Sequence, residues 1–368
     1  MEEKILNQPM KLFGAVAFGL PYLLGILMGI GYSRGTDLSL FPNAQMMYPA
    51  AGVILAVLIT RRKDDTVPRR FYITYLVFAL IMMVMAVISL MAPSENWPVI
   101  MNLAIILGSI VCGLMLLTEE KKRRQAWGLL GGRRGQSTLM VLLFVALYMA
   151  RTIFSYAISG QLSSMAEIFT DPSIIAVIAL LPVNFFFVFI AFFGEEYGWR
   201  YYLQPTLQKR FGMVKGVLFL GVLWGLWHLP INLFYYATPA KALVSMAGQQ
   251  VTCITLGVFF AYAYMKTQNI WVPVILHYLN NNLIPVIAGN LSSDILVNQE
   301  ISWGSVLFGL VLNGVLFLGF LLTKYFKAEQ YRPSVMNENG IRLEEDQEPV
   351  EAVILPGMME DEDDDLEE

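Results

Sequence analysis

Charged residues are scarce in this sequence of 368 residues. Asp, Glu, Lys and Arg make up 15% of it, whereas a soluble domain carries about 25%. Hydrophobic residues make up 56%, more apolar surface than a soluble fold can bury, so most of the chain is expected to lie in lipid. This excludes a soluble enzyme, a nucleic-acid-binding protein and a fibrous protein. Because the apolar runs are continuous and not alternating, it also excludes a transmembrane β-barrel.

Cysteine and histidine are also rare, with two residues of each. Cys112 and Cys253 both lie inside apolar runs, which argues against a disulfide framework. His228 and His277 lie inside apolar runs as well, and the loops, where histidine is easily solvated, contain none. Ionisable groups inside a membrane are costly and mark functional sites by default.

Apolar stretches of about 20 residues are long enough to cross the hydrocarbon core as helices. Ten such stretches cover residues 12–32, 44–60, 71–92, 98–118, 137–159, 173–194, 214–236, 247–265, 270–288 and 303–326. The second is short, and prolines interrupt the ninth. With the N-terminus in the cytosol, the predicted inner loops hold 22 Lys and Arg residues and the outer loops hold two.

This asymmetry follows the positive-inside rule and supports ten spans with both termini in the cytosol. Eight spans are the alternative. If two neighbouring stretches did not cross the membrane, the other loops would still alternate between the inner and the outer side. The predicted fold class is therefore an all-α polytopic transmembrane helix bundle of eight to ten spans. A multi-pass protein of this kind is expected in the plasma membrane of a bacterium or in the endoplasmic reticulum of a eukaryote.

We divide the chain into three regions. Residues 1–70 form an N-terminal transmembrane extension of two spans, and residues 71–326 form a core whose motifs lie within 180–285. Residues 327–368 form an acidic tail, since residues 333–368 hold 14 of the 29 acidic residues and one basic residue, Arg342. Charge runs of this kind repel themselves and bury nothing, so the tail is predicted to be disordered and cytosolic.

Two neighbouring carboxylates, Glu195 and Glu196, lie at the inner end of the sixth predicted span. Glu196 and Arg200 are four residues apart, so they face each other on a helix and can pair. Glu195 lies about 100° around the helix, without an obvious partner within it. An unpaired carboxylate at this depth suits a general base.

The seventh and ninth predicted spans repeat an i,i+4 pattern. Trp224 and His228 share one helix face, and so do His277 and Asn281. Counting about 1.5 Å per residue from the cytosolic ends places all of these groups, with Glu195, in the cytosolic half of the bilayer. A Glu, two His and an Asn around a wet cavity can activate water and stabilise an oxyanion, as peptide hydrolysis requires.

The three motifs, in this order on successive helices, resemble those of the CAAX-protease and bacteriocin-processing (CPBP, or Abi) family of intramembrane endopeptidases. The resemblance covers residues 180–285. The family's second motif more often begins with Phe, where this chain has Trp224. The resemblance implies that Glu195 is the general base, that His228 helps to hold the attacking water, and that His277 and Asn281 stabilise the oxyanion.

In the same reading, Glu196, Arg200 and Trp224 are structural supports of the site. The pattern favours a metal-free mechanism with no cofactor. Zinc bound by Glu195, His228 and His277 is the alternative, because two His and a Glu can be three zinc ligands. However, the sequence has no HExxH motif, and Asn281 is a poor zinc ligand.

The expected partners are membrane lipid and a membrane-associated peptide or prenylated protein as substrate, with no nucleic acid. Two other function classes stay open. A transporter would spread its ionisable groups over several helices, whereas here they cluster, apart from Arg151 in the fifth span. A catalytically silent family member, acting as a scaffold or immunity protein, would be expected to lack Glu195 or His228.

Overall fold

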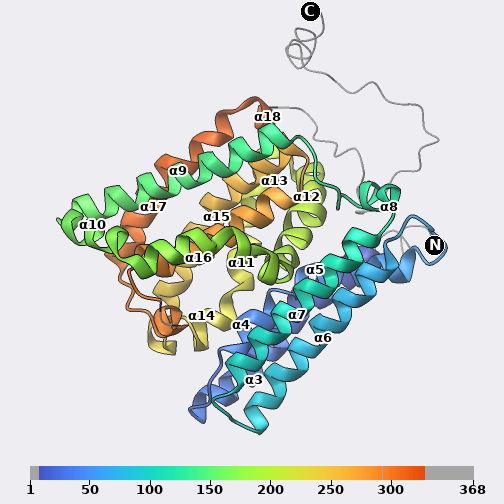
Figure 1. Cartoon of the computed structure of the whole chain (residues 1–368), viewed down its shortest axis with the longest axis horizontal. Coiled ribbons are helices and arrows are strands. Elements are labelled where there is room, and N and C mark those ends of the chain that lie inside the picture. The colour runs from blue at the N-terminus through green and yellow to red at the C-terminus, as the bar shows by residue number, and fades with distance from the viewer. Residues whose placement is uncertain (1–7, 292, 328–368) are drawn as a thin grey trace, which may run out of the picture.

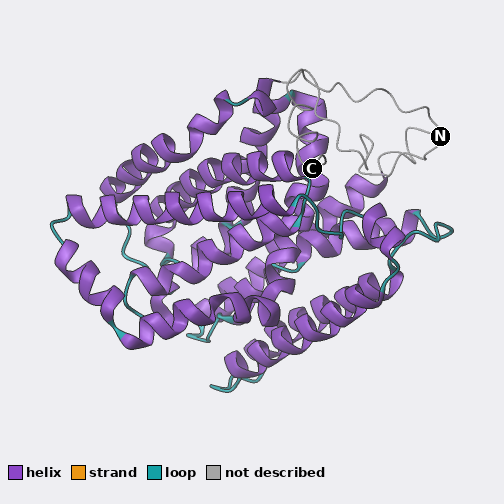
Figure 2. Cartoon of the chain, turned by 45° about the horizontal axis from the view of Figure 1, so that its top comes forward, coloured by secondary structure: helices purple, strands orange, loops and turns teal. Residues whose placement is uncertain are grey.

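The computed structural model describes residues 8–291 and 293–327, and all regular secondary structure in these ranges is helical (Figure 2). The predicted all-α class is confirmed. The predicted acidic tail lies outside the described residues, apart from Lys327. The helices are α2 (Gln8–Gly14), η1 (Ala15–Gly19), α3 (Leu20–Ser33), α4 (Leu40–Gln45), α5 (Tyr48–Thr60), α6 (Arg69–Met91), α7 (Trp97–Thr118), α8 (Lys121–Ala126), α9 (Arg134–Ile158), α10 (Leu162–Thr170), α11 (Pro172–Glu196), η2 (Tyr197–Leu203), α12 (Gln204–Phe211), α13 (Met213–Trp227), α14 (Leu229–Phe234), η3 (Pro239–Lys241), α15 (Ala242–Thr267), α16 (Trp271–Ile287), η4 (Ser293–Leu296), α17 (Trp303–Phe317), η5 (Leu318–Leu322) and α18 (Lys324–Lys327).

Within the described residues, nine helical segments are long and apolar enough to cross a membrane. The chain is thus a multi-pass membrane protein by its helix composition. The nine segments are Gln8–Ser33, Leu40–Thr60, Arg69–Met91, Trp97–Thr118, Arg134–Ile158, Pro172–Phe211, Met213–Phe234, Pro239–Thr267 and Trp303–Leu322. Each contains or largely overlaps one of the predicted stretches.

The preferred count of ten spans needs correction at the ninth predicted stretch, residues 270–288. This stretch is helical, but its helix α16 has 17 residues and is not among the nine segments. At 1.5 Å per residue it is about 26 Å long, shorter than the hydrocarbon core of about 30 Å. Whether α16 crosses decides on which side the chain ends, so the cytosolic location of both termini stays a prediction.

Helix α11 joins two groups of helices. In Figure 1 the helices α3 to α7 (blue to cyan) lie together in one half of the molecule, and those from α9 onward (green to orange) make up the other half. Helix α11 packs against α5 and α7 of the first group and against α16 of the second. Residues near its C-terminal end therefore lie where the two groups meet.

Both ends of α11 have clear causes in the sequence. At its start, Asp171 is the N-cap and Pro172 is the first helical residue, a combination that favours helix initiation. Hydrogen bonds from Ser173 lower the pKa of the exposed Asp171 carboxyl. At its other end the helix does not stop. Its hydrogen-bonding changes to the π-helix η2, which begins at Tyr197.

Two glycines allow the end of α11 to approach the N-terminal helices closely. A Cβ atom on Gly194 would collide with the backbone oxygen of Met46, and one on Gly198 would collide with Pro49. Larger residues would push the end of α11 away from Met46 and the start of η2 away from α5. The glycines thus bring the neighbouring Glu195 against the N-terminal group of helices.

Candidate active site

A cavity of about 370 Å³ is lined mainly by residues of the second group of helices, with Glu195 of α11 and with Pro42 and Met46 of the first group. Its volume is within the range of about 300–1,000 Å³ that is usual for ligand pockets. Glu195 from α11, His228 from the junction of α13 and α14, and His277 and Asn281 from α16 all line it. The structure therefore brings together the four residues that the motifs single out, although their catalytic roles stay predictions.

The carboxylate of Glu195 is held by two indole groups. Trp224 Nε1 donates to Glu195 Oε2 at 2.7 Å, and Trp199 Nε1 approaches the same oxygen at 3.4 Å. The Glu195 residue is only 2% exposed, and no Lys or Arg pairs with it among the described residues. The sequence predicted no obvious partner for Glu195 within its own helix, whereas the structure places Trp199, four residues later, at 3.4 Å and Trp224 of α13 at 2.7 Å.

Trp199 and Glu195 are four residues apart across the change from α11 to the π-helix η2. π-Helical segments are rare and occur mostly at functional sites. Here the segment aims both Trp199 and Arg200 inward, since each is completely buried. The sequence predicted the Glu196–Arg200 pair but not this change of helix type.

Glu196 forms an ion pair with Arg200 and also contacts a residue of a distant helix. Arg200 Nε lies 3.0 Å from Glu196 Oε2, and His277 Nδ1 lies 2.8 Å from Glu196 Oε1. The guanidinium group lies over the ring of Trp224, 4.8 Å from its centroid. Glu196 therefore connects α11 to α16 at the site, a link that i,i+4 spacing could not reveal.

His228 occupies the break between α13 and α14. Its Nδ1 lies 2.8 Å from the backbone oxygen of Trp224. Because a carbonyl oxygen only accepts hydrogen bonds, Nδ1 is the protonated nitrogen of the neutral ring. Nε2 then keeps its lone pair. The ring of Trp227 packs edge-on against the imidazole at 4.8 Å.

A short chain of side-chain hydrogen bonds supports the His228 backbone. Asn232 Nδ2 donates to the backbone oxygen of His228 at 3.0 Å, and Ser245 Oγ donates to Asn232 Oδ1 at 2.6 Å. Both polar residues are buried. These hydrogen bonds therefore stabilise the backbone conformation at the break between α13 and α14.

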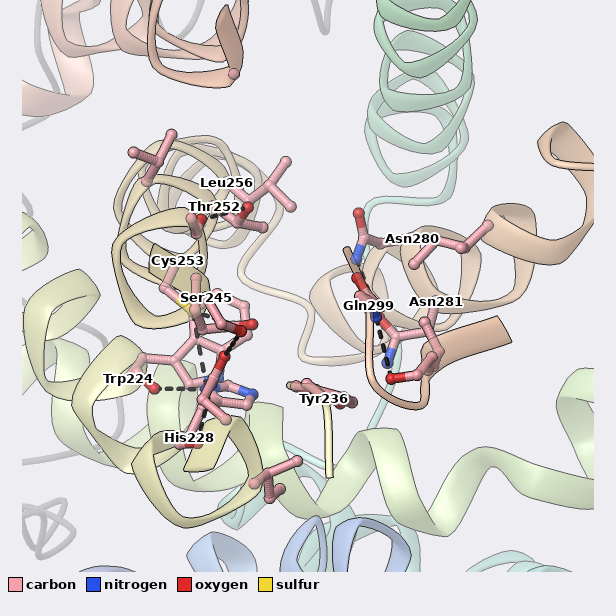
Figure 3. Close-up of a pocket in the computed structure, with 18 of the residues that line it drawn as sticks. Trp224, His228, Tyr236, Ser245, Thr252, Cys253, Leu256, Asn280, Asn281 and Gln299 are labelled. Carbon is pink, nitrogen blue, oxygen red and sulfur yellow. Dashed lines mark hydrogen bonds between the residues drawn. The ribbon is translucent and has the colours of Figure 1, made fainter. Parts of the chain in front are cut away.

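The three consecutive asparagines of α16 divide between two environments. Asn280 and Asn281 line the cavity, and Asn280 Nδ2 donates to Asn281 Oδ1 at 3.0 Å. Asn282 instead donates to the backbone oxygen of Tyr278 on its own helix at 2.9 Å. Figure 3 shows Asn280 and Asn281 across the cavity from His228 and Cys253, with Tyr236 between the two sides.

The proposed zinc ligands do not form a metal-binding group in this arrangement. Among the described residues, no three His, Cys, Asp or Glu side chains are grouped closely enough to hold an ion. The hydrogen bonds of Nδ1 leave Nε2 of each histidine as the nitrogen that could bind a metal, so the mismatch lies in the spacing of the three side chains. This spacing does not fit zinc, so we route no step of the proposed chemistry through a metal.

Arg151, which the sequence left without a partner, stacks on an aromatic ring. Its guanidinium carbon lies 4.3 Å from the ring centroid of Tyr148, one turn away on α9. The Tyr148 hydroxyl donates to the backbone oxygen of Asn280 at 3.4 Å. Arg151 thus packs on a tyrosine that hydrogen-bonds to the helix carrying Asn281, and it does not line the cavity.

Several cavity residues lie outside the three motifs. From the N-terminal region 1–70, Pro42 and Met46 line the cavity, and Gln45 Nε2 donates to the Trp227 backbone at 2.9 Å. From α15 and α17, Cys253 and Asn313 line it. A polar residue inside an apolar run was the available signal for Asn313, whereas nothing in the sequence distinguished Met46.

Comparison with known proteins identifies the part of the chain that carries the motifs. Residues 175–283 match the family described as Type II CAAX prenyl endopeptidase Rce1-like, and this segment is therefore a domain of that family. The resemblance stated from the motifs is confirmed. Glu195, His228, His277 and Asn281 all lie within the matched segment.

A distant homologue agrees with this assignment. CAAX prenyl protease 2 of Methanococcus maripaludis is 28% identical over 106 residues, which are 27% of this chain and 39% of that protein. The chain therefore spans about two fifths of the relative's length in the match. No solved structure matches the chain at a significant level.

Proposed function

We propose that this chain is an intramembrane endopeptidase that hydrolyses a peptide bond of a membrane-associated peptide or a prenylated protein. One observation carries the proposal. Glu195, His228, His277 and Asn281, from three separate helices of the Rce1-like segment, line the same cavity. A buried carboxylate that shares a cavity with imidazole and carboxamide groups provides the side chains that activation of a water molecule requires.

In the proposed reaction Glu195 is the general base. Both indole N–H groups donate to its Oε2, which leaves Oε1 to accept a hydrogen bond from water. As the water oxygen attacks the scissile carbonyl carbon, the carboxylate takes a water proton. It then passes that proton to the leaving amine when the C–N bond breaks. His228, whose Nε2 carries a lone pair, orients the water.

His277 and Asn281 stabilise the oxyanion of the tetrahedral intermediate. Glu196 accepts from His277 Nδ1, so a protonated His277 ring is paired and can donate from Nε2 to the oxyanion. The side-chain amide of Asn281 provides a second donor. Donors fixed in a water-poor site stabilise developing negative charge far better than donors in water do.

The test is cleavage by the purified full-length chain in liposomes. Two quenched fluorescent peptides serve as probes, one farnesylated at a C-terminal CAAX sequence and one with the same sequence unprenylated. We compare the wild type with Glu195→Gln and with the control Glu167→Gln, the same change at an exposed glutamate of α10. Wild type and control should cleave, and Glu195→Gln should be slower by about 100-fold or more.

The two peptides also separate the substrate classes. Cleavage of the farnesylated peptide alone would indicate a requirement for the prenyl group, and cleavage of both would indicate a peptide protease without it. Binding of a peptide without cleavage by the wild type would contradict the enzymatic proposal and favour a silent scaffold. Cleavage by Glu195→Gln at the wild-type rate would contradict the role of Glu195.

A further inference from the structure

Helix α17 lies outside the segment that matches the protease family, yet one of its faces lines the active-site cavity. Ser305, Gly309 and Asn313 recur every four residues, and all three line the cavity. The opposite face carries Leu307, Val311 and Val315, which are 62%, 60% and 76% exposed. One side of α17 is thus apolar and exposed, and the opposite side, with its small and polar residues, forms a wall of the cavity.

The side-chain oxygen of Asn313 lacks a hydrogen-bond donor in the part of the chain that the structure describes. The residue is 7% exposed, and its Oδ1 is buried without a hydrogen-bond partner among the described residues. Most buried side-chain acceptors are paired, because leaving one unpaired costs the full desolvation of that group. Oδ1 itself is covered in this structure, so a donor that arrives with a ligand would reach it after a rotation of the Asn313 side chain.

The rest of the cavity indicates the kind of ligand. Among the described residues that line it, Glu195 is the only Asp or Glu, and none is Lys or Arg. Carboxamides predominate among the polar groups, and they are Asn232, Gln249, Asn280, Asn281, Gln299 and Asn313. Carboxamides match the donors and acceptors of a peptide backbone, whereas a charged side chain would find no opposite charge there apart from Glu195 and the protonated His277 of the proposed mechanism.

We propose that Asn313 is a substrate-binding residue whose Oδ1 accepts a hydrogen bond from a backbone N–H of an extended, uncharged peptide segment lying along α17. This inference rests on the proposed endopeptidase function and names how its substrate is held. An extended peptide at membrane depth must have every backbone group satisfied by protein or water. Asn313 provides one such acceptor.

Gly309 gives the peptide room beside this acceptor. A Cβ atom built on Gly309 would meet no atom within 4 Å, so a side chain is compatible with the empty site. Gly309 lies one helical turn before Asn313 on the same face. A valine at this position should occupy the space along α17 without disturbing the fold.

The experiment measures binding separately from cleavage. In the Glu195→Gln background, the full-length chain in detergent micelles is titrated with the farnesylated and unprenylated CAAX peptides used above, up to about 1 mM, the weak end of specific binding. The variants are Asn313→Leu, Gly309→Val and the control Val311→Leu on the lipid-facing side. The titrations are repeated with peptides that carry a single N-methylated backbone amide, which cannot donate.

Asn313→Leu should weaken binding by about ten-fold, as expected for the loss of one hydrogen bond. Gly309→Val should also weaken it, and Val311→Leu should not. One N-methylated peptide should bind to the parent more weakly than the unmethylated peptide does. The two peptides should bind equally well to Asn313→Leu, because that variant has already lost the acceptor of the same hydrogen bond. The melting temperature of Asn313→Leu should equal or exceed that of the parent, since the substitution removes an unpaired buried acceptor.

Each other result overturns the inference. Unchanged binding by Asn313→Leu, or no binding of either peptide to the parent, leaves the residue without a role in substrate binding. A lower melting temperature of Asn313→Leu means that Asn313 has a structural partner. Failure of the proposed function is a separate result, because it appears as absent cleavage by the wild type while binding still depends on Asn313.

Discussion

His277 Nδ1 lies 2.8 Å from Glu196 Oε1, although 81 residues separate the two in the sequence. Glu196 also pairs with Arg200, so one carboxylate holds both a neighbour on its own helix and a histidine of α16. All three side chains are almost completely buried. Glu196 therefore both pairs with Arg200 and contacts a residue of the candidate active site.

Replacing Glu196 by Gln should lower stability and activity together. The substitution leaves the buried Arg200 charge without a counter-charge, and breaking one partner of such a pair costs about 3–5 kcal/mol. It also turns one of the two acceptor oxygens into a donor, so His277 and Arg200 can no longer both be satisfied. Thermal unfolding in detergent should show a clearly lower melting temperature. An unchanged melting temperature would contradict the structural role of the pair.

Replacing Glu195 by Gln should abolish cleavage without a loss of stability. The Gln oxygen can still accept from Trp224, which donates to Glu195 at 2.7 Å, and no cation is left unpaired. Loss of a general base costs about 100- to 10,000-fold in rate. Steady-state cleavage and a thermal melt on the same sample check this. The contrast with Glu196→Gln is informative, because both variants should lose cleavage but only Glu196→Gln should also have a lower melting temperature.

Replacing Trp224 by Phe should reduce activity without abolishing it. The ring would still pack between Arg200 and the imidazole of His277, whose centroid lies 5.5 Å from that of Trp224. What disappears is the N–H donor to Glu195, and a hydrogen bond to a charged group contributes about 1.5–3 kcal/mol. We expect a fall in kcat of about ten-fold or more. Trp303→Phe, at an exposed position of α17, is the matched control and should leave kcat unchanged.

Replacing Asn232 should affect catalysis through the position of His228. Asn232→Asp keeps the acceptor for Ser245 but loses the donor to the His228 backbone oxygen. If the chain of hydrogen bonds orients His228, kcat should fall while KM changes little, and Asp should not rescue the defect of Asn232→Ala. If neither variant lowers kcat and both lower only the melting temperature, Asn232 has a purely structural role.

The sequence predicted most of the membrane helices, because each apolar run is long enough to specify a span by itself. The run at 71–92, for example, corresponds to α6, Arg69–Met91. The prediction was least accurate at α16, whose polar asparagines and short length reflect its place beside the cavity. Orientation depends on loop charges relative to a membrane, and the helices alone do not test it.

Within the site, local spacing predicted contacts inside one helix and could not predict contacts between helices. The i,i+4 rule led from Glu196 to Arg200 and from Trp224 to His228. It gave no indication that Trp224 donates to Glu195 or that Glu196 reaches His277, because those contacts depend on how α11, α13 and α16 pack. Asn313 was open to prediction as a lone carboxamide in the apolar run 303–326, where polar groups are costly.

The last prediction concerns zinc. The purified, active full-length chain should contain far less than one zinc per chain, and chelation should slow cleavage only modestly. The reason is geometric. Zinc sites need three or four closely placed ligands, whereas among the described residues Glu195, His228 and His277 do not form such a group. Elemental analysis of the active sample decides this. One zinc per chain, lost and restored together with activity, would reverse the assignment and make these three residues metal ligands.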